Sequence, residues 1–113
     1  MKYLLILLAF YFFQPAFCQT TADNKALVTF FKDYTEDGYK LFPLEAIYAG
    51  DYRYNDLLPI TFTDSYNEKS KQYYSRYLNG IKQFDRNLLN ANDKISYDIL
   101  KRILEMGLEG LNY

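Results

Sequence analysis

The sequence predicts an all-α fold made of three amphipathic helices, with a long, ordered, aromatic-rich loop between the first two. Apolar residues recur at spacings of three and four over three stretches of about twenty residues, which is typical of helices that bury one face. Capping residues and a proline stand where these stretches begin or end. The apolar faces are broad for a chain of 113 residues, and we therefore expect the N-terminal part of a larger helical domain.

The first helix is predicted over residues 22–41, with Thr20 or Thr21 as its N-cap. Gly38 weakens its last turn, and Phe42-Pro43 ends it because the residue before proline avoids helical backbone angles. One face of this helix is apolar and comprises Ala26, Leu27, Phe30, Phe31 and Tyr34.

Residues 43–63 show no clean helical or strand period and contain the turn formers Gly50, Asn55, Asp56 and Pro59. A short helical turn is predicted at residues 44–49. The rest is too apolar and aromatic for a solvated loop, so we expect it to pack on the helices. Compact loops of this kind often carry function.

The second helix is predicted over residues 65–87, where Ser65 and Glu68 match a capping box. The third is predicted over residues 91–111, with Asn90 as N-cap and Asp93 as a carboxylate in the first turn. Its broad apolar face comprises Ile95, Ile99, Leu100, Ile103, Leu104, Leu108 and Leu111.

Residues 1–18 have the pattern of an export signal: Lys2, an uncharged apolar run over residues 3–13, and the breaker Gln14-Pro15. The apolar run is too short to span a bilayer. We predict cleavage after Cys18, which gives a periplasmic or secreted protein. No membrane span is then expected once the signal is removed. The alternative is a lipoprotein that is acylated at Cys18, which the large Phe17 disfavours. Residues 19–113 then form the helical segment.

Composition excludes several classes of function. The formal charge is −1, from 13 basic and 14 acidic residues, so no charge excess favours nucleic acid as a partner. The chain contains no histidine, which excludes a Ser-His-Asp triad and a His-ligated metal site. Its one cysteine excludes an intrachain disulfide. We therefore expect no catalytic residue, metal or cofactor in this chain.

The candidate functional residues lie in the loop. Arg53 stands between two tyrosines and beside Asp51, so it could bind a substrate carboxylate or hold the loop by stacking and by pairing with Asp51 or Asp56. We favour the second role. Gly50 is expected to supply a turn with a positive φ angle or a close approach of the backbone. The candidate set that could line a cleft or fix the loop is Tyr48, Gly50, Asp51, Arg53 and Asn55.

Carboxylate pairs and tyrosines offer two further readings. Glu45 with Asp51, or Asp51 with Asp56, could form an acid–base pair, but turn and capping roles explain them better. The 13 tyrosines could form a platform for a glycan or a peptide. The candidate platforms are Tyr73, Tyr74 and Tyr77, or Tyr48, Tyr52 and Tyr54. Helical spacing places Tyr66, Tyr73 and Tyr77 toward the core.

The chain resembles the start of the bacterial domain-of-unknown-function 885 family over about residues 25–111. The pattern Pro-x-x-Ala-x-x-x-Gly followed by Leu-Pro is matched by Pro43, Ala46, Gly50 and Leu58-Pro59. The later pattern Leu-x-x-x-Asp-x-x-x-Tyr-Asp-x-Leu is matched by Leu89, Asp93, Tyr97-Asp98 and Leu100. The order and spacing of these motifs together carry the resemblance.

The resemblance implies a zinc metallopeptidase-like protein whose His-Glu-x-x-His motif lies on a downstream helix, where two histidines bind zinc and the glutamate activates water. Zinc is expected only in a full-length relative. This chain then corresponds to the non-catalytic N-terminal helical part, as a fragment or a truncated product. Its partners are the remainder of the polypeptide and a peptide substrate. The alternatives are a small exported tyrosine-rich binding module for a glycan or peptide, and a structural remnant without activity.

Overall fold

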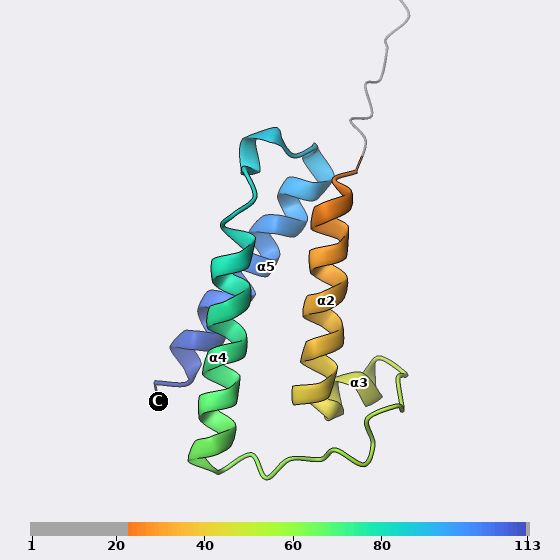
Figure 1. Cartoon of the computed structure of the whole chain (residues 1–113), viewed down its shortest axis with the longest axis vertical. Helices are drawn as coiled ribbons and strands as arrows, with labels where there is room; N and C mark the ends of the chain where they lie inside the picture. The colour runs from red at the N-terminus through yellow and green to blue at the C-terminus, as the bar shows by residue number, and fades with distance from the viewer. Residues whose placement is uncertain (1–22, 113) are drawn as a thin grey trace, which may run out of the picture.

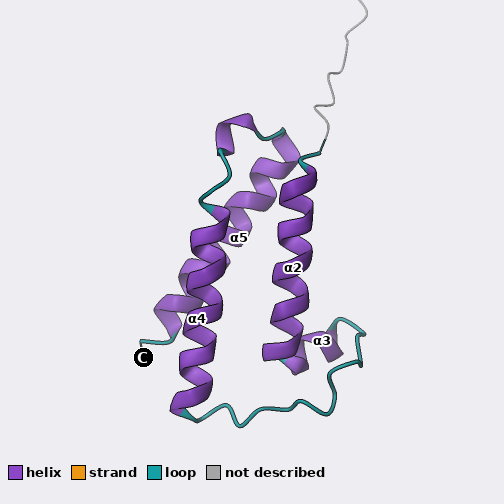
Figure 2. Cartoon of the chain, in the orientation of Figure 1, coloured by secondary structure: helices purple, strands orange, loops and turns teal. Residues whose placement is uncertain are grey.

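The computed structural model describes residues 23–112, and this part of the chain is all-α, as predicted (Figure 2). The predicted signal segment 1–18 with Cys18 lies outside the described residues. The predicted cap of the first helix at Thr20 or Thr21 is wrong, because this helix begins at Lys25 with Asn24 as its N-cap. The described helices are α2 (Lys25–Leu41), α3 (Pro43–Tyr48), α4 (Asp64–Ile81), the short 3₁₀ helix η2 (Arg86–Leu88) and α5 (Ala91–Gly110).

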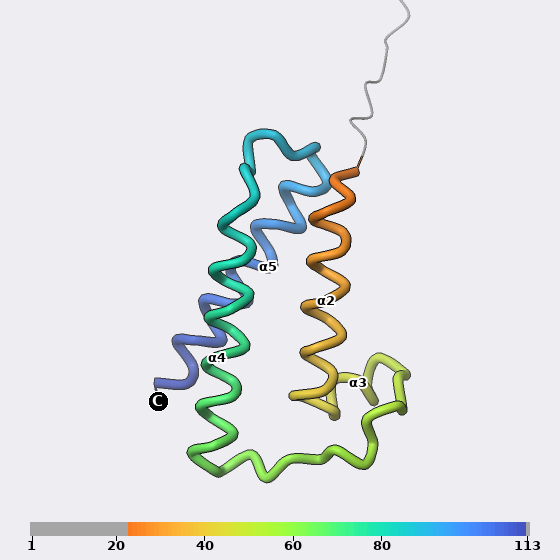
Figure 3. Tube along the Cα trace, in the orientation of Figure 1, coloured from red at the N-terminus to blue at the C-terminus, as the bar shows by residue number. Residues whose placement is uncertain are grey.

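Helix α4 packs against both other long helices (Figure 1). Helices α2 and α4 run in opposite directions, and α5 runs antiparallel to α4 and crosses behind it. The tube in Figure 3 shows that the connection after α3 passes below the C-terminal end of α2 before it enters α4. Short α3 sits against the end of α2, where Ala46 is fully buried.

Aromatic rings fill the interface between α2 and α4. Phe30 of α2 lies edge-on to Tyr77 of α4 at 5.5 Å between ring centroids, and Tyr34 stacks on Tyr73 at 5.6 Å. The buried Tyr73 hydroxyl donates to the backbone oxygen of Tyr34 at 2.9 Å. The ring of Phe84, beyond α4, contacts Phe30 at 5.5 Å. Tyr73 and Tyr77 are thus core residues, as their helical spacing predicts.

Helices α4 and α5 bring buried aliphatic side chains into the core. Ile81 of α4 and Leu104 of α5 are completely buried, and Leu100 is nearly so. The ring of Tyr74 lies directly over Gly107, where an added Cβ would stand 2.6 Å from a ring carbon. The absence of a side chain at Gly107 therefore lets α5 approach α4 closely.

The N-terminal ends of α2 and α5 share their caps. Asn24 accepts from Leu27 N at 3.1 Å, and its own backbone N–H donates to the Asp93 carboxylate at 3.0 Å. Asn90 accepts from Asp93 N at 2.7 Å and donates from Nδ2 to Asp23 at 3.3 Å. The carboxylate of Asp93 therefore lies where the positive ends of two helix dipoles meet, which is favourable. The predicted caps of the third helix are confirmed, and the start of α2 is fixed to that of α5.

Two predicted boundaries of the second helix are wrong. The N-cap is Thr63, whose hydroxyl accepts from Tyr66 N at 3.2 Å, so the Ser65 capping box does not form the helix start. The helix ends at Ile81, six residues before the predicted end at Asn87. A turn follows, and Asp85 then accepts from Asn87 N at 2.9 Å to start η2. This local side-chain bond competes with helical geometry and lets the chain reverse into α5.

Helix α5 carries a second apolar face that the described residues leave uncovered. Only its Tyr97–Leu100–Leu104 side is buried against α4. A row of four residues on the other side remains 46–59% exposed, and we call it the α5 stripe: Ile95, Ile99, Ile103 and Met106. Its spacing of four, four and three residues places all four on one helix face.

Candidate functional site

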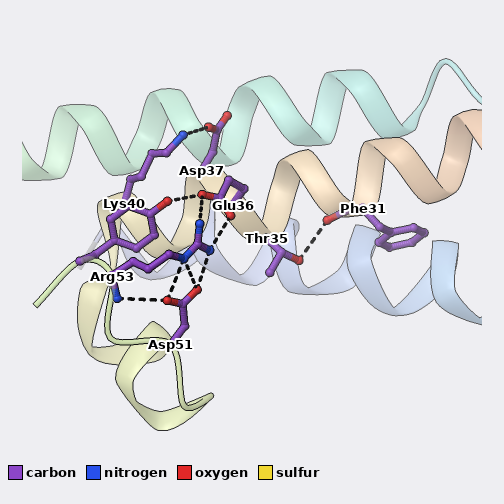
Figure 4. A network of polar contacts seen from close by, with 8 residues as sticks. Phe31, Thr35, Glu36, Asp37, Lys40, Asp51 and Arg53 are labelled. Atoms are coloured by element: carbon purple, nitrogen blue, oxygen red, sulfur yellow. Dashed lines mark hydrogen bonds and ion pairs between the residues drawn. The ribbon is translucent and has the colours of Figure 1, made fainter.

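Arg53 holds the connection between α3 and α4 against α2 (Figure 4). Its guanidinium donates to both carboxylate oxygens of Asp51, at 2.6 to 3.0 Å, and to both oxygens of Glu36 on α2, at 3.0 and 3.2 Å. The Tyr54 hydroxyl also donates to Glu36, and the guanidinium lies 5.1 Å from the Tyr54 ring centroid. We call these four residues the Arg53 network.

The two carboxylates of the Arg53 network are stabilised in their ionised form by the hydrogen bonds that they accept. The hydrogen bond from Tyr54, together with those from Arg53, lowers the pKa of Glu36. The same guanidinium lowers the pKa of Asp51. Because two carboxylates occupy the bidentate faces of Arg53, this side chain meets a structural partner rather than an open cavity. Asp51 is one of the two partners that the sequence suggests, and Glu36 takes the place of Asp56.

The other predicted loop residues lie around this network without joining it. Gly50 follows α3 with a φ of 83°, the positive value expected of it, which lets the chain turn toward Asp51. Tyr48 ends α3 and is 82% exposed. Asn55 is exposed, and its backbone N–H donates to Tyr52 O at 3.4 Å in the next turn. Asp51 acts through Arg53, so neither proposed carboxylate pair describes its setting.

An open groove lies between α2, the connection and α4, with a volume of about 910 Å³. We call it the α2–α4 groove. Its walls come from the C-terminal end of α2, the last residues of the connection, and one face of α4. The lining residues are Asp37, Lys40, Leu41, Leu57, Pro59, Ile60, Thr63, Ser65, Tyr66, Lys69, Gln72, Tyr73 and Arg76.

Positive charge exceeds negative charge in this groove. Asp37 is its one lining carboxylate, and it accepts from Arg76 at 2.7 Å and from the Tyr77 hydroxyl at 2.6 Å, while Lys40 lies 3.5 Å away. The hydrogen bond from Tyr77, with the nearby cations, lowers the pKa of Asp37, which therefore stays ionised. Lys69 is exposed on the α4 side of the groove.

Sequence reasoning missed the long-range charged pairs at the groove and in the Arg53 network. Asp37 and Arg76 pair across 39 positions of sequence, and Glu36 meets Arg53 across 17. Such pairs depend on how α2, the connection and α4 pack together, which no local pattern encodes. The only local signal is the spacing of three between Asp37 and Lys40, which brings the two side chains together on one helix face.

The described residues form neither a cluster of metal ligands nor a membrane-spanning helix. Within residues 23–112, no three side chains of the His, Cys, Asp or Glu types are grouped so that they could hold a metal ion. None of the helices in that range is long and apolar enough to cross a bilayer.

Comparison of the chain with protein-family models, with curated proteins and with solved structures found no match.

Proposed function

We propose that this chain is the non-catalytic N-terminal helical lobe of an exported, metallopeptidase-like protein. In this role it packs through the α5 stripe on an apolar helical face of the same, longer polypeptide, which supplies the zinc ligands and the reacting groups. The observation that carries the proposal is the α5 stripe itself.

The α5 stripe is costly in water and has the form of a packing surface. Four large aliphatic side chains stand in one row, each about half exposed. Full burial of such a side chain contributes about 1.5–3 kcal/mol relative to exposure, so covering the remaining half of all four contributes several kcal/mol. Single exposed apolar residues are ordinary, whereas an aligned row on one helix marks a contact surface.

The residues that carry the first motif of the family resemblance lie where the backbone or the packing favours their residue type, which also supports the proposal. Pro43 begins α3, where a proline fits because its missing N–H needs no partner there. Ala46 is fully buried against α2, and Gly50 adopts its positive φ immediately after the helix. The spacing Pro-x-x-Ala-x-x-x-Gly thus corresponds to one short helix and the turn that ends it.

The proposal is tested by sedimentation velocity on the chain starting at Gln19. We expect concentration-dependent self-association, because two α5 stripes can cover each other when their intended partner is missing. The double variant Ile99→Glu with Ile103→Glu should be monomeric and still helical by circular dichroism. A matched control is Val28→Glu with Leu44→Glu, since these residues are 55% and 52% exposed on α2 and α3. A wild-type chain that stays monomeric, or a control that disperses it equally, contradicts the proposal.

The same preparation tests the absence of catalytic groups. We expect less than one equivalent of zinc per chain by elemental analysis after incubation with zinc and desalting. We also expect no cleavage of a mixed peptide library by mass spectrometry. Stoichiometric zinc with turnover would show that the chain itself is the enzyme.

A further inference from the structure

We propose that the α2–α4 groove binds a short extended peptide that carries carboxylate side chains among apolar ones. This inference rests on the proposed function only for the source of the peptide, namely a substrate of the longer protein. It extends that function by naming a place and a ligand class.

The charge of the groove selects for an anionic ligand. Three cations line it against one carboxylate, which leaves an excess of two positive charges in a chain whose net charge is −1. Lys40 and Arg76 share Asp37 between them, so neither cation is fully compensated. Among the described residues Lys69 makes no ion pair within 4.0 Å, and its ammonium is free to meet a ligand.

The connection gives the groove an apolar wall. Leu57 and Ile60 line it and are 48% and 70% exposed, and Pro59 stands between them. A ligand that covers these side chains removes apolar surface from water while its carboxylates meet the cations of α2 and α4. This combination fits an acidic peptide with aliphatic residues better than it fits nucleic acid, which offers phosphates but no aliphatic side chains.

The spacing of the cations sets the spacing of the carboxylates. Lys69 and Arg76 lie on one face of α4, two helical turns apart, so their Cα atoms are separated by about 10 Å. A peptide in the extended polyproline II conformation advances about 3.1 Å per residue with three residues per turn, so carboxylates three residues apart lie on one face and span about the same distance. The groove volume of about 910 Å³ is enough for several residues of such a peptide. The expected pattern is Glu-x-x-Glu with aliphatic residues between the glutamates.

The test is fluorescence anisotropy with a dye-labelled acetyl-Ala-Glu-Leu-Leu-Glu-Ala peptide and the monomeric Ile99→Glu, Ile103→Glu protein. We expect saturable binding that weakens as salt is added. The added double substitution Lys40→Gln with Lys69→Gln should weaken it about three- to tenfold, since it removes two cations whose solvent-exposed ion pairs with the peptide are each of modest strength. The matched control is Lys71→Gln with Lys82→Gln, which removes the same charge outside the groove and should leave affinity unchanged.

Each other outcome counts against the groove proposal. Equal loss in the control pair indicates a general charge effect, and equal binding of the Gln-x-x-Gln peptide removes the role of carboxylates. Tighter groove-dependent binding to anionic lipid vesicles or to single-stranded RNA assigns the groove to a different ligand class. Because the α5 stripe is tested by self-association and the groove by peptide affinity, either proposal can fail while the other stands.

Discussion

Gly38, inside α2, receives the side chain of a tyrosine from the neighbouring helix. A Cβ added at Gly38 would lie 2.6 Å from the Tyr73 hydroxyl oxygen. That hydroxyl is buried and donates to Tyr34 O one turn earlier on α2, so it occupies a fixed position. A helical glycine ordinarily costs about 1 kcal/mol relative to alanine. Here the missing side chain makes room for a buried hydroxyl that donates to the backbone oxygen of Tyr34.

Substitution of Gly38 should therefore reverse the usual order of helix propensity. We expect Gly38→Ala to destabilise the fold by about 1–3 kcal/mol, the usual cost of an overpacked site, as measured by urea denaturation. Gly110→Ala is the control, because its added Cβ meets no atom within 4 Å and the substitution should be neutral or slightly stabilising. In a Tyr73→Phe background the cost of Gly38→Ala should shrink, since the atom that is too close is gone. Additive effects would contradict this contact.

The connection between α3 and α4 is an ordered element although it contains little regular structure. Gly50 turns the chain out of α3, and Arg53 then attaches it to α2 through Glu36. Beyond that point Leu57 and Pro59 reach the α2–α4 groove. The Arg53 network therefore fixes the position of one groove wall.

Loss of the Arg53 network should loosen this element without unfolding the helices. We expect Arg53→Gln to change the free energy of unfolding only slightly, because exposed ion pairs contribute little. Amide hydrogen exchange over residues 50–60 should nevertheless become faster by about tenfold. Arg102→Gln, which removes another exposed arginine with a long 3.8 Å pair, serves as the control and should leave that exchange unchanged. A uniform increase over all helices would contradict a local role.

At the level of elements, the sequence predicts what forms but places some ends wrongly. Amphipathic spacing identifies all three long helices, and the sequence also predicts, without a clean period, the short turn that becomes α3. This spacing does not locate the end of α4, because Phe84 continues the apolar spacing beyond Ile81. The ring of Phe84 reaches Phe30 from a turn and not from the helix. A periodic pattern cannot distinguish these two ways of burying one ring.

Across the whole molecule, tertiary contacts are held by ionised carboxylates. Hydrogen bonds and ion pairs lower the pKa of the carboxyl groups of Glu36, Asp37, Asp51 and Asp98, the last through Arg86. A carboxyl whose pKa is lower in the folded state stabilises that state above its unfolded pKa. This contribution is lost as the pH falls through the folded pKa. The chain has no histidine, the side chain that ordinarily titrates between pH 5 and 8.

Stability should therefore be level near neutrality and fall only in acid. We expect the melting temperature to stay constant between about pH 5.5 and about pH 8 and to decrease below about pH 4, as carboxyl groups with an ordinary pKa near 3.8 or 4.5 become protonated on unfolding. Thermal melts followed by circular dichroism measure it. Asp37→Asn removes one titrating group and should flatten the acid limb. A transition near pH 6 would contradict this account.

The site was less predictable than the fold because most of its paired residues are far apart in the sequence. Arg53 and Asp51 are two residues apart, and their pairing follows from the local sequence. The partners that give these residues a place in the molecule, Glu36 on α2 and Arg76 with Asp37, become neighbours only when helices pack. Charge patterns in a sequence show which residues can pair, but they do not show which of several carboxylates each cation meets.

The shared caps determine which end of the bundle an attachment at the N-terminus would hold. They clamp the beginning of α2 to the beginning of α5, so polypeptide upstream of Asp23 joins the bundle at that end. The connection and the groove lie at the far end of α2, some 17 residues of helix away. A tether attached through the N-terminus, whether a leader or a lipid, would hold the protein by the end where α2 and α5 share their caps. The end that carries the connection and the α2–α4 groove would then face away from the tether.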